Sequence, residues 1–199
     1  ALIAVSKTFG ADAVAAAHAC GQLAFGENYV QEALAKMASF TNATPPLEWH
    51  FIGPIQSNKT RQIAASFAWV HSVDRLKIAE RLAAARAPGA APLNVCLQVN
   101  IGGETSKSGV APAAVHALAR AVAALPALRL RGLMTVPPPS DDAAQQRRYF
   151  TELRALKEQL TAAGIALDTL SMGMSADLEA AIAEGATLVR VGTAIFGQR

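Results

Sequence analysis

Short apolar runs alternate with longer amphipathic segments along the whole chain. Most of the runs are nearly continuous in apolar residues, which is typical of strands buried on both faces of a parallel sheet. The runs that predict strands are Leu2–Ser6, Leu23–Phe25, Glu48–Gly53, Trp69–Val73, Leu93–Asn100, Leu128–Met134, Leu167–Met172 and Thr187–Val191. The segments between them are long enough to return the chain to the same edge of a sheet as helices.

Several of the amphipathic segments carry the capping residues and closing glycines that mark the two ends of a helix. The predicted helices are Arg75–Arg86 capped by Asp74, a helix from Pro112 to about Ala124, a long helix that Ser140-Asp141-Asp142 begins and Gly164 ends after Ala162, and Asp177–Ala183 between Ser175 and Gly185.

Eight strands with intervening helices predict a (β/α)8 TIM barrel that occupies residues 1–199 as a single domain. The alternative is an open doubly wound sheet, which needs a topological switch point that the pattern does not mark. After the eighth strand only Gly192–Arg199 remain, too few for a full covering helix. We therefore expect a helix that precedes Ala1 to cover this side of the barrel, and the present chain to lack it.

Composition and charge narrow the range of partners. Of the 199 residues, 52% are hydrophobic and 17% are charged, as in ordinary globular domains, and no apolar run is long enough to span a bilayer. The net charge is +3, and the basic residues are scattered, with Arg147-Arg148 the longest basic pair. This pattern argues against a nucleic-acid surface and against a membrane span, and it suits a small anionic ligand.

The two cysteines give no sign of metal or redox chemistry. Cys20 and Cys96 lack the spacing of a metal site or a redox pair, and Cys96 lies inside an apolar run, so we expect it in the core. The histidines and acidic residues show no metal spacing either. The cysteine usage favours a reducing, cytoplasmic location.

Lys7 is the first candidate for chemistry, because it directly follows the first predicted strand. The catalytic groups of (β/α)8 barrels gather at the carboxyl ends of the strands. A lysine whose stem lies in a tight apolar environment is more readily the neutral amine that a Schiff base needs. The alternative is a lysine at the barrel rim that extends its ammonium group into water.

The last two strands end in sequences that suit a phosphate group. These are Ser171-Met172-Gly173-Met174-Ser175 and Arg190-Val191-Gly192-Thr193. Glycines let backbone N–H groups approach an oxygen closely, hydroxyls add donors, and barrels often bind phosphate after strands 7 and 8. Turn chemistry and helix capping could explain either motif alone. The two together, facing Lys7, favour a carbonyl cofactor that carries a phosphate.

Arg190 fits the same interpretation, because a guanidinium can only donate hydrogen bonds. Opposite a pyridine nitrogen it requires that nitrogen to be unprotonated, which makes the ring a weaker electron sink than one paired with a carboxylate. The alternative is a structural ion pair of Arg190 with Glu179 or Glu184.

The remaining candidates are histidines and lysines whose positions in the predicted elements do not indicate a specific role. We expect His18 and His116 to be exposed on helices, and His50 and His71 to face either the barrel lumen or the helices. Lys59 and Lys107 lie in loops after strands, where they assist with a second anion or are simply solvated.

These motifs together resemble the YggS/PROSC family of pyridoxal phosphate homeostasis proteins over essentially the whole chain. The matching segments are Ala4-Val5-Ser6-Lys7-Thr8, Phe25-Gly26-Glu27-Asn28-Tyr29-Val30-Gln31-Glu32, Trp49-His50-Phe51-Ile52-Gly53, Gln56-Ser57-Asn58-Lys59, Val99-Asn100-Ile101, Lys107-Ser108-Gly109, Gly132-Leu133-Met134, Ser171-Met172-Gly173-Met174-Ser175-Ala176-Asp177, Val189-Arg190-Val191-Gly192-Thr193 and Ile195-Phe196-Gly197.

The resemblance implies the fold of the N-terminal domain of alanine racemase, fold type III among enzymes that use pyridoxal 5′-phosphate (PLP). It implies that Lys7 carries PLP as an internal aldimine and that Arg190 faces the pyridine nitrogen. Asn28 would lie near the ring, and the phosphate would be held by Ser175, Gly192 and Thr193, with help from the strand 7 segment Ser171, Met172 and Gly173. Members of the family also have a helix before the strand that ends in the lysine.

Three functions compete on this basis. The resemblance implies a monomeric carrier in vitamin B6 homeostasis that lacks robust catalytic activity and hands PLP to apo forms of PLP-dependent enzymes. A PLP-dependent amino-acid racemase is the alternative, and it needs a second acid–base group that only Tyr29 or Tyr149 could supply as a tyrosine. A third possibility is a Schiff base between Lys7 and a sugar phosphate, as in lysine-dependent barrel aldolases.

Overall fold

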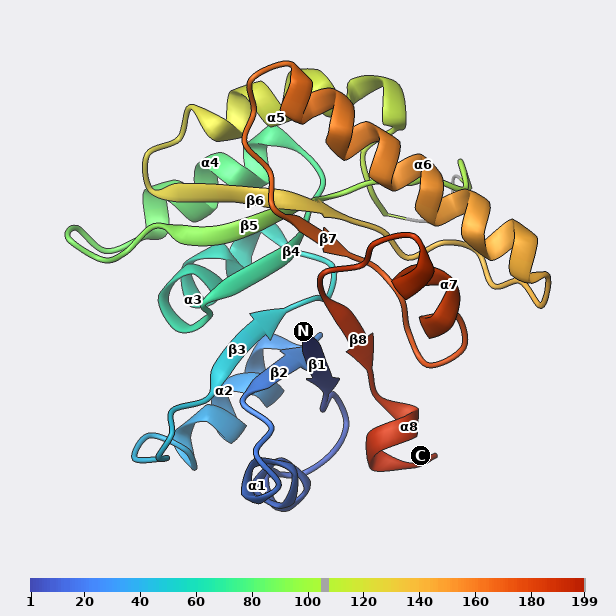
Figure 1. Ribbon diagram of the computed structural model, residues 1–199. Coiled ribbons are helices and arrows are strands. Elements are labelled where there is room, and N and C mark those ends of the chain that lie inside the picture. Colours follow the sequence, from blue (N-terminus) through green and yellow to red (C-terminus); the bar gives the residue numbers. More distant parts are fainter. Residues whose placement is uncertain (105–107, 199) are drawn as a thin grey trace.

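The strands of the protein form one parallel sheet, seen in a computed structural model that describes residues 1–104 and 108–198. The strand order is β7-β6-β5-β4-β3-β2-β1-β8 (Figure 1). The bounds are β1 Leu2–Val5, β2 Ala24–Glu27, β3 Glu48–Phe51, β4 Trp69–Val73, β5 Leu93–Gln98, β6 Leu128–Met134, β7 Thr169–Ser171 and β8 Val189–Val191. Every apolar run of the sequence therefore forms a strand, with ends that differ by a few residues.

The two edge strands of this order meet and close the barrel. Ser171 of β7 forms a parallel bridge with Leu188. The N–H of Met172 donates to the carbonyl of Leu188 at 3.1 Å, and the N–H of Arg190 donates to the carbonyl of Gly173 at 2.9 Å. The (β/α)8 prediction is confirmed, and the open doubly wound alternative is wrong.

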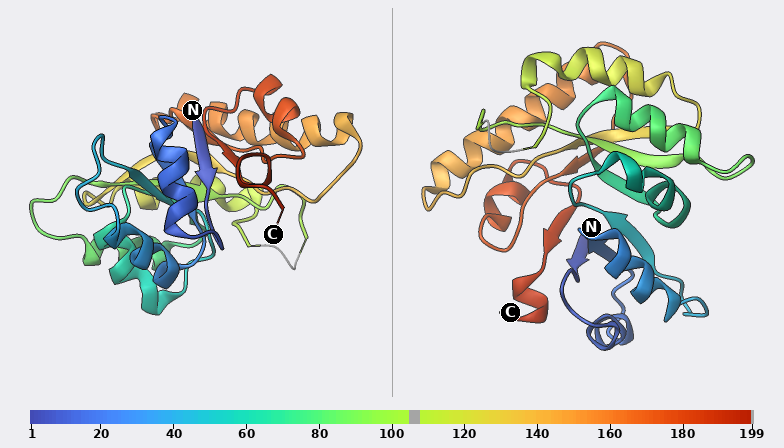
Figure 2. Two further views of the ribbon diagram at one scale, coloured as in Figure 1. Left: turned by 90° about the horizontal axis from the view of Figure 1, so that it is seen from below. Right: turned by 180° about the vertical axis from the view of Figure 1, so that it is seen from behind.

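Helices surround the strands on the outside, as the three views of Figures 1 and 2 show. Their bounds are α1 Ala11–Ala19, α2 Val30–Ala38, η1 Ser57–Lys59, α3 Thr60–Ser66, α4 Leu76–Ala85, η2 Pro112–Ala114, α5 Val115–Ala123, α6 Ala143–Ala162, α7 Leu178–Ala183 and α8 Thr193–Phe196. Here η marks a single 3₁₀ turn.

Two of the expected helix caps differ from the sequence prediction. The carboxylate of Asp74 does not cap α4 and instead pairs with the Arg75 guanidinium at 2.7 Å. Asp177 rather than Ser175 precedes α7, and its Oδ1 accepts the N–H of Met174 at 2.6 Å. By contrast, Asp142 caps α6 as expected, accepting the N–H of Ala144 at 2.9 Å.

The core has a large outer part and a small inner part. Between sheet and helices lies one large cluster that includes Phe25, Trp49, Phe51 and Phe150. A separate small cluster contains Trp69, Cys96 and Met134, so Cys96 is a core residue as predicted. Burial raises the pKa of its thiol to about 12, which keeps it protonated and inert.

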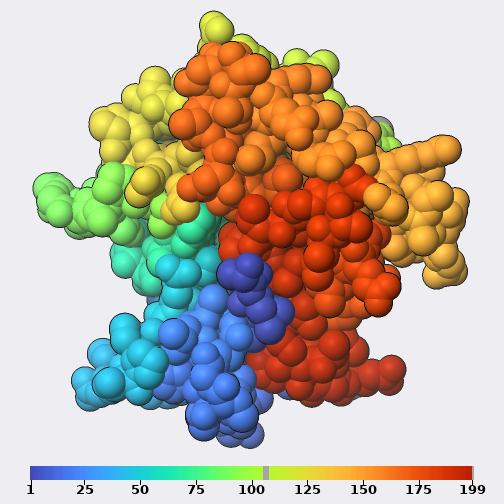
Figure 3. Space-filling view, in the orientation of Figure 1, coloured from blue at the N-terminus to red at the C-terminus, as the bar shows by residue number. Residues whose placement is uncertain are grey.

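The outer side of β1 and β8 is less covered than the rest. Among the described residues, the helix that follows β8 is the four-residue α8, and Leu2 and Ile195 keep 40% and 39% of their surface exposed. Figure 3 shows the first residues, in dark blue, at the surface between the light blue and red segments.

Candidate functional site

A cavity of about 700 Å³ opens at the carboxyl ends of six consecutive strands, β6, β7, β8, β1, β2 and β3. Its apolar walls include Val5, Ile52, Val136 and Met174. The predicted site residues that line it are Lys7, Asn28, Ser175, Arg190, Gly192 and Thr193. The structure therefore brings the loops after the first and last two strands together around one space, as the barrel topology requires.

The other predicted site residues lie beneath this cavity or behind it. Ser171 is fully buried, and its Oγ accepts a hydrogen bond from the Arg190 guanidinium. The Met172 side chain belongs to the core between sheet and helices. Gly173 has a φ of +94°, and a Cβ there would lie 2.5 Å from the Cβ of Ala181, so only glycine fits this turn.

Lys7 begins a strained turn at the end of β1. The lysine is partly buried, and the next residue, Thr8, has a φ of +68°. A threonine in this region is uncommon and costs conformational energy, so the surrounding structure must hold it there. The Glu32 carboxylate on α2 stabilises this conformation by accepting a hydrogen bond from the N–H of Thr8.

A buried ionic cluster connects this turn with β2 and α2. The Lys36 ammonium donates to the carbonyl of Ser6 at 2.6 Å and to carboxylate oxygens of Glu27 at 2.7 Å and Glu32 at 2.6 Å. The hydroxyl of Ser6 donates to the same oxygen of Glu27 at 2.6 Å. This cluster fixes the residues on both sides of Lys7. The sequence analysis missed it, although the Glu32–Lys36 spacing of four on a helix was a visible signal.

Glu27 is the most constrained member of the cluster. Its side chain has no exposed surface, and its Oε2 has no hydrogen-bond partner in the described structure. Burial raises the pKa of Glu27, while the hydrogen bonds from Lys36 and Ser6 oppose that rise. The carboxylate thus depends on Lys36 for its charge compensation.

Arg190 is a buried cation at the floor of the cavity. It is 4% exposed, and burial lowers the pKa of its guanidinium to about 10, which still leaves it protonated at neutral pH. Its two terminal nitrogens donate to Ser171 Oγ at 2.7 Å and to the carbonyl of Thr135 at 2.8 Å. Since a guanidinium has five N–H donors, others are left for a ligand in the cavity.

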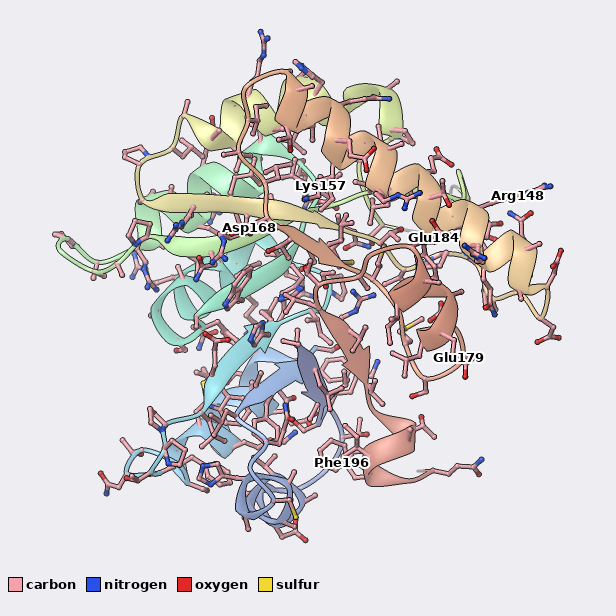
Figure 4. The ribbon with its side chains drawn as sticks, viewed as in Figure 1. Arg148, Lys157, Asp168, Glu179, Glu184 and Phe196 are labelled. Carbon is pink, nitrogen blue, oxygen red and sulfur yellow. The ribbon has the colours of Figure 1, made fainter. Side chains whose placement is uncertain are left out.

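The alternative ion pairs of Arg190 are wrong. The Glu184 carboxylate instead pairs with Arg147 at 2.7 Å and Arg154 at 3.1 Å. Figure 4 shows Glu184 between α6 and α7, with Glu179 on the other side of α7. Within residues 1–104 and 108–198, no salt bridge of Arg190 is present.

The polar groups around the cavity fit an aromatic aldehyde with a phosphate arm. Asn28 Oδ1 is buried and has no partner among the described residues, which suits a donor from a ligand. Ser175 and Thr193 are exposed, so their hydroxyls are accessible to a phosphate. Gly192 and Thr193, at the start of α8, both line the cavity. The donor set therefore matches the group that the sequence predicts.

The structure settles which side of the barrel wall His50 and His71 face, a choice that the sequence left open. His50 and His71 face the lumen, where their rings lie 2.9 Å apart, Nδ1 to Nε2. His116 is exposed as expected, whereas His18 is partly buried and contacts the carbonyl of Pro45 at 2.9 Å. Lys59 lines a separate cavity of about 260 Å³ next to Asn28, and Lys107 lies outside the described residues.

The described part of the chain contains no group of three or more histidine, cysteine, aspartate or glutamate side chains placed to hold a metal ion. None of its helices combines the length and the apolar character needed to cross a membrane.

Comparison with known proteins gives consistent results. The family model for the alanine racemase N-terminal domain matches residues 1–199. The chain is 63% identical to the pyridoxal phosphate homeostasis protein of Pseudomonas aeruginosa, over 100% of this chain and 84% of that protein. It is 42% identical to PipY of Synechococcus elongatus in a structure with PLP bound, with a TM-score of 0.90 over 99% of this chain and 92% of that one. An alanine racemase of Clostridium difficile shares the fold, with a TM-score of 0.80 at 15% identity over 100% of this chain and 52% of that one.

Proposed function

The chain belongs to the YggS/PROSC family of pyridoxal phosphate homeostasis proteins, which carry the alanine racemase N-terminal domain, and we propose that it binds PLP at Lys7 to store and deliver it. The observation that carries this proposal is the convergence of Lys7, Arg190 and the two hydroxyls of Ser175 and Thr193 on one cavity. PLP binding by PipY supports it, since the two chains are similar throughout.

Each polar group has one role toward the cofactor. Lys7 would hold the cofactor covalently through its aldehyde carbon, with the aldehyde oxygen released as water. Ser175, Thr193 and the backbone at Gly192 hold the phosphate through hydrogen bonds. Arg190 would donate to the pyridine nitrogen, which would then have to be unprotonated, because a guanidinium has only donors.

This set of groups favours retention of the cofactor over its use in catalysis. PLP supplies an electron sink when it is bound, and that sink is weaker with arginine than with a carboxylate at the ring nitrogen. Racemisation also needs a second acid–base group. Tyr29 lies in the neighbouring cavity and is 57% exposed, and Tyr149 packs against the core from α6, so neither lines the described PLP cavity. A racemase is the less supported alternative.

Absorption spectroscopy tests the binding proposal directly. Addition of PLP to the purified chain should give the visible band of a protonated Schiff base, and Lys7→Ala should abolish it. Lys77→Ala, an exposed lysine on α4, is the matched control and should leave the band unchanged. A colourless protein that cannot be loaded with PLP would contradict the proposal. Sustained racemisation of any amino acid that Lys7→Ala abolishes would replace the carrier with an enzyme.

The remaining elements of the proposal concern the setting of the protein. Residues 1–199 act as one cofactor-binding domain, in the cytoplasm, as a monomer. Apo forms of PLP-dependent enzymes receive the cofactor. Transfer of PLP from the loaded chain to an apo-enzyme, faster than release into a solution with a PLP-trapping amine, is the measurement that checks delivery.

A further inference from the structure

A chain of polar side chains crosses the lumen of the barrel and ends at Arg190. The Arg190 guanidinium lies 2.7 Å from Ser171 Oγ, which lies 2.8 Å from His71 Nδ1. The other nitrogen of His71 lies 2.9 Å from His50 Nδ1, and His50 Nε2 lies 2.9 Å from the Glu48 carboxylate. Every link has the length of a good hydrogen bond.

The chain of contacts runs through the interior and connects the two mouths of the barrel. His71 is on β4 and Ser171 on β7, two strands that are not neighbours in the sheet, so their contact crosses the lumen. Ser171, His71 and His50 are at most 1% exposed. Glu48 is the first residue of β3, at the mouth opposite the cofactor cavity, and its side chain is 51% exposed.

Proton accounting fixes the direction of each hydrogen bond. Arg190 can only donate, so Ser171 Oγ accepts from it and has its own proton to give. The described partner that can take that proton is His71 Nδ1. A neutral His71 then carries its proton on Nε2 and donates to His50 Nδ1, and a neutral His50 donates from Nε2 to Glu48. All donors therefore point away from Arg190.

The opposite direction fails at both ends. It would leave the Ser171 hydroxyl proton without an acceptor in the described structure, and it would place the lone pair of a neutral His50 against the Glu48 carboxylate. Both are costly in a buried site. Burial, with a smaller contribution from the Arg190 cation, also lowers the pKa of His71 well below its ordinary value, in agreement with a neutral ring. The hydrogen bond from His50 lowers the pKa of Glu48, in agreement with a carboxylate there.

We propose that Glu48, His50, His71 and Ser171 are positioning residues that act in series to hold Arg190 toward the ring nitrogen of the bound cofactor. This inference rests on the proposed function. We call this chain of side chains, from Arg190 through Ser171, His71 and His50 to Glu48, the relay. Arg190 has no salt bridge in the described structure, so the relay connects it to a carboxylate. The four aligned hydrogen bonds of the relay polarise the guanidinium. None of the four positioning residues is among the residues that line the cavity, so an effect of their substitution on PLP would have to pass through Arg190.

The tautomers of the two histidines give a test that needs no cofactor. In a long-range ¹H–¹⁵N correlation spectrum of the PLP-free protein near neutral pH, His71 should be neutral with its proton on Nε2, and His50 should carry a proton on Nε2, toward Glu48. The exposed His116 serves as the reference for a ring that exchanges between tautomers. A proton on Nδ1 of His71, or a charged His71, would overturn the direction of the relay.

Cofactor affinity gives the functional test, with a comparison that separates the relay from general damage. His71→Leu breaks the relay, and His71→Gln keeps one acceptor and one donor in its place. We expect His71→Leu to weaken PLP binding by on the order of tenfold, the effect of losing a well-aligned hydrogen bond to a charged group, and His71→Gln to restore much of it. Deazapyridoxal phosphate, whose ring nitrogen is replaced by carbon, should bind both variants and the unaltered chain alike. Met134→Leu, another lumen position, is the packing control.

The outcomes distinguish the relay from the proposed function. If the unaltered chain binds PLP and His71→Leu binds it equally well, the relay is overturned while the proposed function stands. Equal losses for PLP and its deaza analogue would also overturn the relay, since only folding would then be affected. If the unaltered chain binds no PLP, the proposed function fails, and the positioning role fails with it whatever the tautomers are. Should His71→Leu not fold, the His71→Gln titration and the tautomer spectrum still decide.

Discussion

Replacement of Lys36 by methionine removes the cation at the centre of the buried cluster below Lys7. Methionine has a similar length and fills most of the space, so the loss is mainly electrostatic. The Lys36 ammonium makes three hydrogen bonds of 2.6–2.7 Å, and its partner Glu27 has no exposed surface. Removal of one partner of such a pair leaves a buried charge without compensation, and typically costs about 3–5 kcal/mol. We expect Lys36→Met to lose about that much unfolding free energy near neutral pH.

The pH dependence of this loss identifies its cause. Burial already raises the pKa of Glu27, and without Lys36 the largest opposing contribution disappears, so the pKa rises further. A carboxyl whose pKa is raised in the folded state binds a proton more readily there than in the unfolded state. The folded variant is therefore relatively favoured as the pH falls through that raised pKa, and the deficit against the unaltered chain should shrink toward acid.

Urea unfolding followed by circular dichroism, at several pH values between neutral and mildly acidic, measures this deficit. The double variant Lys36→Met with Glu27→Gln should recover much of the stability and show no such narrowing. Lys77→Met on the exposed side of α4 is the matched control and should change little. A deficit below about 1 kcal/mol, or one that is the same at every pH, would refute the reasoning, because a buried carboxylate left alone must respond to protonation.

Three further predictions follow from other parts of the structure. Ser175→Ala and Thr193→Ala should each weaken the binding of PLP by on the order of tenfold and leave the binding of pyridoxal, which lacks the phosphate, unchanged. Thr161→Ala on α6 is the control and should change the affinity for neither ligand. Equal effects on both ligands would contradict the phosphate role. His71, with its pKa lowered by burial, resists protonation only in the folded state. The unfolding free energy should therefore be at its full value above the ordinary histidine pKa and fall by up to about 1.4 kcal/mol as the pH drops from about 7.5 to about 5.5. Calorimetry should show that unfolding of His71→Gln takes up as much as one proton less over this range than unfolding of the unaltered chain. In Gly132→Ala the new Cβ would lie 1.8 Å from the carbonyl oxygen of Thr169, so β6 and β7 must separate, at a cost of about 3 kcal/mol or more in unfolding free energy. Gly103→Ala has open space around the new Cβ but a φ of +66°, and should cost about 1–2 kcal/mol. The reverse order of the two variants in thermal unfolding would contradict this account.

The barrel could be predicted from sequence because its strands are continuous apolar runs, buried on both faces. The ends of the strands were harder to place. The second run ends at Phe25, but β2 continues through Gly26 and Glu27. Glu27 reads as a loop residue in the sequence, and it lies in the strand only because Lys36 and Ser6 satisfy its carboxylate in the interior.

The first candidates of the site were visible because they lie at the carboxyl ends of strands, where barrel topology brings loops together. Lys7 and Arg190 are 183 positions apart in number, yet β1 and β8 are paired neighbours, so the closed sheet places both at one cavity. The direction of a side chain within a strand could not be predicted in the same way. The sequence left His50 and His71 between lumen and helices, because both sides of a barrel strand are buried.

The supporting interactions depend on partners that sequence spacing does not reveal. His71 and Ser171 are 100 residues apart, and only closure of the barrel makes them neighbours. The same holds for the relation of Lys36 to the end of β1, which is 30 residues distant. Such contacts are long-range consequences of the fold, whereas capping and glycine signals are local.

Covalent attachment of PLP to one lysine is the central claim, and mapping of the attachment site tests it most directly. The PLP-loaded chain is reduced with borohydride, which adds hydride to the C–N double bond and makes the linkage permanent, and is then digested and analysed by mass spectrometry. The account predicts the added mass on the peptide that contains Lys7, and its loss in Lys7→Ala. An adduct found mainly on another lysine, or no stable adduct at all, would contradict the account.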